Sequence, residues 1–389
     1  MAWIIPEHKL DPQQRNFIDM QDFTRENIWI KGFPGSGKSV LLAYTLKKIK
    51  SRKPHASVVV VVFTRSLVQM FNEAFKEMNE DVTVCTFYEF MNSSRKYDYV
   101  LSDEVQDLVP SVLREMKTRA SHVVVAGDEN QSIYERDPKF REDTVSSSEI
   151  NKLLSSRSFE LGIIHRLSSS IINVIQRFMP NMNIFSAKRD QTKTSTQVRI
   201  CEANGSNEEV KYIMREAGRA TKIGESAAIL LPTQNAIVKF VNAALSAEDK
   251  SPWPQQLNNW GRLDFSSMNS YLSQQGLKLK YVGNGIGAFS SDDSRIIIMT
   301  YHSSKGLDFD NVFIPFMNNS LFIVPDETKS KTLFMVAMTR SRNNLYLTYS
   351  GYKHPYLNSF STQCNAIDIH DALSSTTTFR TNSSNPFGI

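Results

Sequence analysis

"IWIKGFPGSGKSVLLAYTLKKI", Ile28 to Ile49, sets an apolar, strand-like run before a glycine-rich turn and a run with helical spacing after it. Within it, Gly32, Gly37, Lys38 and Ser39 satisfy G-x-x-x-x-G-K-[ST], the pattern of a phosphate-binding loop. Backbone amides of such a loop, at the positive end of the following helix, hold a polyphosphate. An ordinary glycine turn needs neither the Lys-Ser pair nor this context, so the stretch predicts a nucleotide-binding α/β fold.

The residues of this loop have separate expected roles. Lys38 should contact the β- and γ-phosphates of ATP, and the Ser39 hydroxyl should bind Mg²⁺. ATP and Mg²⁺ are therefore the expected cofactors. The other loop positions expected to bind the nucleotide are Gly32, Pro34, Gly35, Ser36 and Gly37.

Composition limits the class of protein. At 389 residues the chain is too long for one typical domain, and 41% hydrophobic residues can fill its cores. No apolar run approaches the length of a membrane span, and "MAWIIPEHKL" lacks the features of a secretory signal, so we expect a cytoplasmic protein with no membrane partner. The three cysteines have no C-x-x-C spacing, which suggests reduced thiols. A formal charge of +5 is compatible with nucleic acid but does not require it.

Strands alternate with helical patterns along the chain, which predicts parallel sheets covered by helices. "SVVVVVF" is continuously apolar and β-branched, as expected of a strand buried on both faces. A second series of strand-like runs begins with "QVRICEA", after the polar stretch 139–158, in which we place the crossing between domains. We expect two tandem α/β domains, 1–158 and 159–373, and a Ser- and Thr-rich disordered tail, 374–389.

Acidic residues follow two of the strand-like runs in the first half. Asp103 and Glu104 in "VLSDEVQD" suit one carboxylate for Mg²⁺ and a neighbour that deprotonates the attacking water. Ligands of open parallel sheets lie at the carboxyl ends of the strands, where the phosphate loop also lies. Gln131 in "GDENQSIY" follows the next strand and could sense the γ-phosphate, although glutamine in a loop usually lies on the surface. Together with the loop, these side chains favour nucleotide hydrolysis.

Five further segments carry a family resemblance. "GFPGSGKS", "DEVQD", "GDENQSIY", "TYHSSKGLDF" and "VAMTRSRNNLYL" follow the order of the motifs of superfamily one helicases. From "LDPQQ" to Leu347, the chain resembles the UvrD, Rep and PcrA type. The resemblance implies two RecA-like (P-loop NTPase) domains with ATP in the cleft between them. It also implies movement along single-stranded DNA in the 3′ to 5′ sense.

The resemblance assigns further residues to the nucleotide. Gln14 in "LDPQQ" matches the glutamine that reads the adenine edge, and Asp308 stands where the family usually has a glutamate against the ribose. Arg166 in "LGIIHRLSSSI" matches the arginine of the family's N-Y-R-S segment, from which the neighbouring residues depart. Arg340 in "VAMTRS" matches the second family arginine. Both arginines should reach the γ-phosphate and stabilise charge in the transition state.

A track for single-stranded DNA is also implied. Phe63, Thr64, Thr86, Tyr134 and His302 match family positions that face the strand. Aromatic faces stack bases with little sequence preference, and hydroxyls can hold phosphates. A phenylalanine that closes a valine-rich strand is equally expected in a core, and "ERDPKF" replaces the F-R-G-A-like segment expected after "QSIY".

Two large helical insertions of processive relatives are missing from this chain. "LVQMFNEAFKEMNE" and a strand fill the first gap, and 247–269 is the only small extra in the second. The chain therefore resembles a reduced motor core, an ATP-dependent translocase or helicase. A DNA-stimulated ATPase switch that regulates a partner, such as a nuclease in a bacterial or phage defence or repair complex, is the alternative. A nucleic-acid-binding module without catalysis is disfavoured because Lys38, Asp103, Glu104 and Arg340 are all present.

Overall fold

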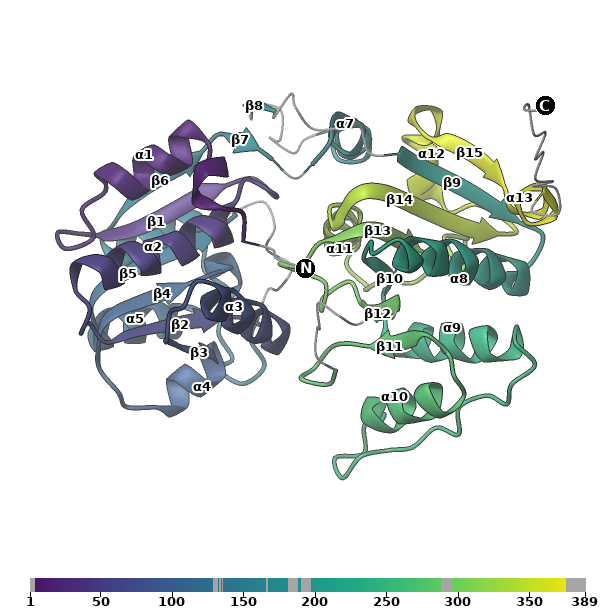
Figure 1. Ribbon diagram of the computed structural model, residues 1–389, viewed down its shortest axis with the longest axis horizontal. Coiled ribbons are helices and arrows are strands. Elements are labelled where there is room, and N and C mark those ends of the chain that lie inside the picture. Colours follow the sequence, from purple (N-terminus) through teal and green to yellow (C-terminus); the bar gives the residue numbers. More distant parts are fainter. Residues whose placement is uncertain are drawn as a thin grey trace, which may run out of the picture.

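The computed structural model describes residues 4–128, 132, 134, 136–165, 167–180, 188–189, 197–287 and 296–375. In this part of the chain two lobes lie side by side, each built on a sheet with helices on both faces (Figure 1). Every ladder in both main sheets is parallel. The predicted pair of tandem RecA-like α/β domains is confirmed.

The first lobe holds a six-stranded sheet in the order β3-β2-β4-β5-β1-β6. The central strands are rich in β-branched residues and are buried on both faces, as in Val58–Val62. The strands are β1 (Asn27–Gly32), β2 (Val58–Val62), β3 (Thr83–Thr86), β4 (Tyr97–Ser102), β5 (Ala120–Gly127) and β6 (Ser156–Leu161). The helices are α1 (Pro12–Met20), α2 (Lys38–Arg52), α3 (Arg65–Glu77), α4 (Phe87–Asn92), α5 (Pro110–Arg119) and α6 (Ser147–Leu154), with 3₁₀ turns at Glu7–Lys9 and Val105–Asp107.

Alternate residues of the first sheet enter two separate cores. Ile28 and Val60 pack with α1, α2 and α3, whereas Trp29 and Val61 pack with α4, α5 and α6. This two-sided burial explains why the strands read as continuous apolar runs rather than alternating ones.

The second lobe holds a seven-stranded sheet in the order β11-β12-β10-β13-β14-β9-β15. Helices α8, α9, α10 and α13 cover one face, and α7 and α11 pack on the other. The strands are β9 (Gln197–Ala203), β10 (Ala227–Leu231), β11 (Leu279–Tyr281), β12 (Ile296–Thr300), β13 (Phe309–Ile314), β14 (Ser341–Ser350) and β15 (Asn365–Asp368). The helices are α7 (Ser169–Phe178), α8 (Ser206–Lys222), α9 (Gln234–Ser246), α10 (Phe265–Gln274), α11 (Glu327–Met338), α12 (Pro355–Asn358) and α13 (Ile369–Ser374), with a 3₁₀ turn at Ser361–Gln363.

The polar stretch 139–158, expected to cross between the domains, lies within the first lobe instead. Its helix α6 buries Ile150 and Leu154, and β6 pairs with β1 in the same sheet. The stretch reads as polar because α6 buries a narrow stripe and β6 is a half-exposed edge strand. We therefore propose a domain boundary after Leu161 rather than at 158. In the expected tail, Ser374 still belongs to α13, and 376–389 lie outside the described residues.

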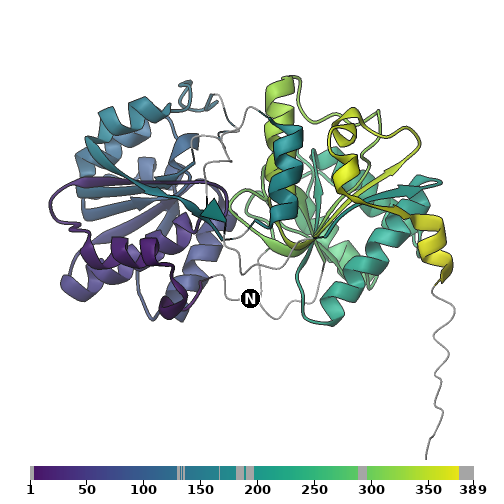
Figure 2. The same cartoon turned by 90° about the horizontal axis from the view of Figure 1, so that it is seen from above.

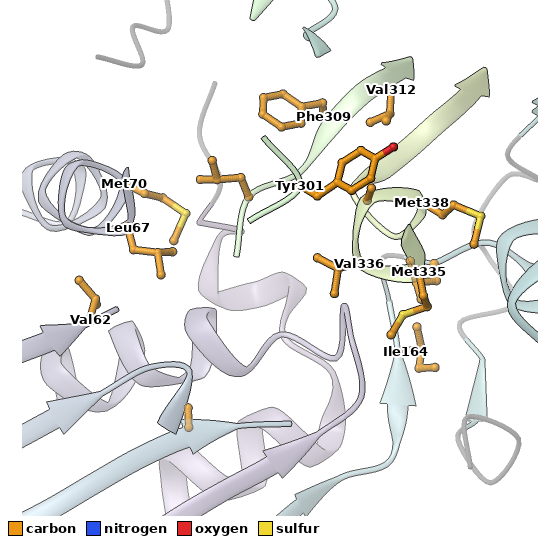
Figure 3. Close-up of a cluster of buried hydrophobic side chains, with 14 of the residues drawn as sticks. Val62, Leu67, Met70, Ile164, Tyr301, Phe309, Val312, Met335, Val336 and Met338 are labelled. Atoms are coloured by element: carbon orange, nitrogen blue, oxygen red, sulfur yellow. The ribbon is translucent and has the colours of Figure 1, made fainter. Parts of the chain in front are cut away.

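The two lobes meet through apolar side chains from both. Leu67 and Met70 of α3 belong to the same buried cluster as Tyr301 of the second lobe (Figure 3). The strands β7 (Ile163–Ile164) and β8 (Lys188–Arg189) form a two-stranded sheet at the top of Figure 1, between the lobes. Seen from above, α7 lies over α11, which agrees with ring centroids of Phe178 and Phe334 5.3 Å apart (Figure 2). Among the described residues, no helix combines the length and apolarity needed to cross a bilayer.

Candidate nucleotide and nucleic-acid sites

The predicted phosphate loop joins β1 to α2 through two glycines in the left-handed region. Gly35 has φ +73° and Gly37 has φ +87°, backbone conformations that residues with a Cβ rarely adopt. Helix α2 begins at Lys38, and no side chain caps its first turn. The exposed N–H groups of a helix N-terminus and its positive dipole end favour an anion at this position.

The loop fits a bound polyphosphate. The Ser36 hydroxyl is buried without a hydrogen-bond partner, and a Cβ at Gly32 would lie 2.4 Å from it. The Lys38 ammonium donates to the carbonyls of Gly32, at 2.8 Å, and Phe33, at 3.1 Å. These contacts hold the lysine over the loop. Pro34 is buried at the start of the turn.

Ser39 and Asp103 meet at the carboxyl end of the sheet, as predicted. The Ser39 hydroxyl donates to Asp103 Oδ2 at 2.5 Å. A hydroxyl and a carboxylate are oxygen donors of the kind that Mg²⁺ prefers. Among the described residues, no group of three or more His, Cys, Asp or Glu side chains is arranged to hold a metal. Ser39 and Asp103, together with oxygens of the nucleotide, would hold a metal here.

Glu104 is held in a strained backbone conformation. Its φ of +55° and ψ of +42° are uncommon for a residue with a side chain, and such strain concentrates at functional sites. Gln106 Nε2 donates to Glu104 Oε2, while Gln106 Oε1 accepts from the backbone N–H of Asp128 at 3.0 Å. Because Oε1 faces that N–H, the amide nitrogen must face Glu104. Gln106 therefore fixes the orientation of the carboxylate, a role that our sequence analysis missed.

Lys305 approaches Glu104 from the second lobe. Its ammonium pairs with Asp107 and lies 3.7 Å from Glu104 Oε2. Burial alone would raise the pKa of Glu104, but Lys305 and then Lys38 outweigh it and lower that pKa. Burial, followed by the neighbouring Glu104, raises the pKa of Asp103 to about 6. The charges around Glu104 thus favour its ionised form more than those around Asp103 do, and its role as the base stays a prediction.

Lys305 and Asp107 were not assigned from the sequence. They lie within the motifs "TYHSSKGLDF" and "DEVQD", of which only His302, Asp308, Asp103 and Glu104 received roles. The motifs carried a usable signal, since a lysine and an aspartate in two segments of one site can form a charge pair.

Arg340 follows α11 and is buried, with 1% of its surface exposed. Its guanidinium donates to Val336 O at 2.9 Å, Leu307 O at 3.1 Å and Thr339 Oγ1 at 2.9 Å. Burial raises the pKa of Glu104 in the first lobe, and Arg340 is one of the groups that lower it. Its effect is smaller than those of Lys305, Lys38 and Gln106. The burial of Arg340 excludes an exposed surface salt bridge at this position, and its role at the γ-phosphate stays a prediction.

Gln14 contacts the phosphate loop from α1. Its Nε2 donates to Ser36 O at 3.0 Å, and its Oε1 accepts from the N-cap residue Asp11. The side chain is buried, so reading of an adenine edge by Gln14 stays a prediction. His165 contacts α1 and the phosphate loop. Its ring Nε2 lies 2.6 Å from Asp11 Oδ2, and its backbone N–H donates to Gly35 O at 2.9 Å. The adjacent Arg166 lies outside the described residues, as does Gln131.

Asp308 has a strong partner within its own lobe. Arg342 donates to both carboxylate oxygens, Nε to Oδ2 at 2.8 Å and the terminal nitrogen to Oδ1 at 2.7 Å. This two-pronged pair competes with the predicted contact to a ribose, which no further observation supports.

Three of the predicted track residues form a continuous aromatic series. Phe63 stacks on Tyr134, with ring centroids 4.5 Å apart, and Tyr134 contacts the His302 ring at 5.7 Å. Phe63 also stacks on Phe87 at 5.1 Å, which anchors the series in the core of the first lobe. The series crosses from the first lobe to the second, because His302 follows β12. We call Phe63, Tyr134 and His302 the aromatic series below.

The two threonines of the predicted track serve as helix caps. Thr64 Oγ1 accepts from Leu67 N at 3.2 Å at the start of α3. Thr86 forms a capping box with Glu89: its hydroxyl donates to Glu89 Oε2 at 2.9 Å and accepts from Glu89 N at 3.3 Å. Capping satisfies free N–H groups of a helix and occupies these hydroxyls, so any contact with a DNA phosphate must compete with it.

Comparison with known proteins agrees with the two halves of the site. Residues 14–137 match the family model "AAA domain", and residues 268–352 match the "UvrD-like helicase C-terminal domain". None of the curated proteins matches the sequence significantly. Among solved structures, the chain is similar to the Arterivirus nonstructural protein 10, a helicase, in complex with DNA, with a TM-score of 0.41 and 16% identity. That similarity covers 87% of this chain, and the chain spans 63% of that protein's length. The two family models cover Lys38, Asp103 and Glu104 on one side and His302, Lys305 and Arg340 on the other, and the matched part of the second lobe is similar to the C-terminal domain of UvrD-like helicases.

Proposed function

We propose that this protein hydrolyses ATP to move along single-stranded DNA in the 3′ to 5′ sense, as a motor of the helicase type. The family supports nucleic-acid helicase activity, and the direction and the DNA strand are inferred from the motif resemblance. The observation that carries the proposal is the position of Glu104, where burial would raise the pKa but Lys305 of the other lobe, then Lys38 of its own lobe and, more weakly, Arg340 of the other lobe lower it.

The chain's own residues support a division of chemical roles. Lys38, Ser39 and the loop amides would hold the phosphates of ATP, and Ser39 and Asp103 would hold Mg²⁺, which neutralises phosphate charge when bound. Glu104, fixed by Gln106, accepts a proton from the attacking water. Arg340 would approach the γ-phosphate from the second lobe, where its guanidinium can stabilise charge in the transition state.

Cleft closure supplies the coupling to movement. A nucleotide held by groups from both lobes favours the closed arrangement, and hydrolysis removes that preference. The aromatic series contains side chains from both lobes, so a change in the cleft also changes the surface on which bases stack.

A second candidate function is a DNA-stimulated ATPase switch that acts on a partner protein, such as a nuclease. The observation that favours it is the connection between β2 and β3, which consists of α3 and short turns, with no accessory domain. Between α9 and α10, residues 247–264 contain an antiparallel bridge between Leu257 and Leu263 and a Trp260 that is 84% exposed. Neither connection supplies a domain that would separate a long duplex.

The test combines hydrolysis and movement. ATP turnover is measured with and without a single-stranded oligonucleotide, and displacement of streptavidin from either end of a biotinylated oligonucleotide reports direction. We expect strand-stimulated hydrolysis and displacement from the 5′ end only. Stimulated hydrolysis without displacement from either end would favour the switch. Absence of ATP turnover with single-stranded DNA and RNA alike would contradict both candidates.

A further inference from the structure

One compact turn of the second lobe connects the aromatic series with the proposed catalytic base. After β12, Ser304 N donates to Thr300 O at 3.0 Å and Lys305 N donates to His302 O at 3.3 Å. His302 and Lys305 are therefore one turn apart and bonded through their backbones. A displacement of either residue must move the other.

The two side chains of this turn face different partners in the first lobe. The His302 ring contacts Tyr134 with centroids 5.7 Å apart. The Lys305 ammonium bonds to Asp107, which lies 198 positions earlier in the chain. It also lies 3.7 Å from Glu104 Oε2. The side chains of Lys305, Asp107 and Glu104 are 3%, 0% and 10% exposed. The Lys305 ammonium thus lies beside two buried carboxylates of the other lobe.

The turn is pressed directly against α3. Gly306 has φ +80°, and a Cβ built there would lie 2.6 Å from Leu67 Cδ2. Leu67 and Met70 of α3 share a buried cluster with Tyr301 and Leu307, which flank the turn (Figure 3). The contact leaves little room for the turn to shift without the lobes moving, so its position reports the state of the cleft.

We propose that Lys305 is a positioning residue that transmits strand binding at His302 to Glu104. The inference rests on the proposed function, since it concerns how a strand stimulates hydrolysis at that site. A base that stacks against His302 and Tyr134 moves the turn 300–307, and the Lys305 ammonium moves with it relative to Asp107 and Glu104. The orientation and charge balance of the catalytic base then depend on whether a strand is bound.

The first experiment replaces Lys305 with Met, which keeps the length of the side chain and removes the charge. The expected result is loss of stimulation by a single-stranded oligonucleotide, measured as kcat with and without it, while the Kd for that oligonucleotide without nucleotide is retained. Lys331→Met is the matched control, because it removes an ion pair with Glu327 on α11 of the same lobe, at 3.1 Å, and should keep full stimulation. Retained stimulation in Lys305→Met overturns the proposal.

Lys305→Met leaves the buried Asp107 carboxylate without the Lys305 ammonium, which could weaken the fold, so a second variant removes that carboxylate as well. Lys305→Met combined with Asp107→Asn removes both charges of the bonded pair, and thermal unfolding reports whether it folds like the wild type. Stimulation restored in this double variant would also overturn the proposal, because the charge of Lys305 would then be dispensable.

The wild-type protein provides a test that needs no substitution. Amide hydrogen exchange is measured with and without the oligonucleotide, in the absence of nucleotide. Changed exchange at both 300–307 and 103–107 supports the link, and a change at 300–307 alone overturns it. A wild type that neither binds the strand nor hydrolyses ATP contradicts the proposed function itself, which distinguishes the two failures.

Discussion

Glu104 combines a strained backbone, a fixing amide and cations from both lobes. Replacement by Gln keeps an oxygen that can accept from Gln106 but cannot take a proton from water. We expect turnover to fall by about a hundredfold or more, the usual contribution of a general base. Steady-state hydrolysis and binding of a fluorescent ATP analogue check this, and affinity should be retained. Lys38→Ala should lose both turnover and nucleotide affinity, because the lysine ammonium contacts the phosphates in the bound nucleotide as well as in the transition state.

Near-normal turnover in Glu104→Gln would remove this residue from the reaction. Affinity lost together with turnover would instead indicate that Glu104 shapes the binding site.

Arg340 has both a structural and a proposed catalytic role, and substitutions can separate them. Arg340→Ala removes the guanidinium donor of Leu307 O, which costs about 1–3 kcal/mol, whereas Val336 O keeps its bond from the Thr339 hydroxyl at 2.8 Å. Arg340→Lys keeps a cation while losing the planar fork. We expect turnover of folded Arg340→Lys to fall by about a thousandfold, as for other arginine fingers. Thermal unfolding run beside hydrolysis is the check, and a loss of turnover that only follows the folded fraction would contradict the catalytic role.

At the scale of elements, Thr86 tests whether a capping hydroxyl also touches DNA. Thr86→Ser keeps the capping box of α4, whereas Thr86→Val removes its hydroxyl and should cost about 1 kcal/mol of unfolding free energy. Because Oγ1 is already bonded to Glu89, we expect equal affinity of both variants for single-stranded DNA. Denaturant unfolding and fluorescence anisotropy measure the two quantities. Weaker DNA binding by Thr86→Val alone would restore the predicted phosphate contact.

Helix α8 carries a buried carboxyl that ties it to the end of the second sheet. Glu209 Oε1 accepts from Phe316 N at 2.7 Å and Thr348 Oγ1 at 2.6 Å, and Phe316 has φ +61°. Burial raises the pKa of Glu209 above 4.5, although Thr348, Phe316, Ser350 and Lys239 oppose the shift. A raised folded pKa gives a contribution to stability that is complete below 4.5 and is lost as pH rises through the folded pKa.

Glu209→Gln should therefore remove one source of pH dependence. The glutamine can keep both bonds to Oε1 and stays neutral, so wild-type Tm should fall relative to the variant as pH rises above 4.5. Thermal melts over a pH series measure the difference. A Tm difference that does not change with pH would contradict a shifted carboxyl at this position.

The elements themselves differ in how visible they are in the sequence. The five valines of β2 predict a buried strand because both faces are covered. The edge strand β6 and helix α6 were misread as a crossing, since partial burial leaves few apolar residues to mark them. The hydroxyl of Thr86 was assigned to DNA because a family match locates a residue but not its hydrogen bonds.

At the scale of the molecule, the predicted track consists of aromatic rings and hydroxyls, and none of its five residues, Phe63, Thr64, Thr86, Tyr134 and His302, is a lysine or an arginine. If two to four phosphates are contacted, log K for a single strand should fall with log salt, with a slope of about −0.7 per contact. Strand binding measured across a salt series tests this value. We expect strong stimulation of hydrolysis but weak unwinding by the isolated protein. Robust unwinding of a long duplex under single-turnover conditions would point to residues 252–264 as a strand-separating element.

Contacts between the lobes were the least accessible from the sequence. Phe63, Tyr134 and His302 could be named from motifs, but the contact between their rings depends on how two separately folded sheets meet. The pairing of Lys305 with Asp107 likewise depends on the turn after β12 packing against α3. Local periodicity carries no information on such long-range packing.

The strand order of the first sheet also determines when the sheet can fold during synthesis. The strand β1, which leads into the phosphate loop, pairs with β5 and β6, both made much later in the chain. Until Leu161 has left the ribosome, the apolar residues Ile28, Trp29 and Ile30 lie on a strand that lacks at least one of its two neighbours, β5 and β6. Apolar strands with open edges pair with other chains, so a product terminated before Ala120 should aggregate and should not bind nucleotide. The phosphate loop, although made early, can therefore become functional only after β5 and β6 have been made.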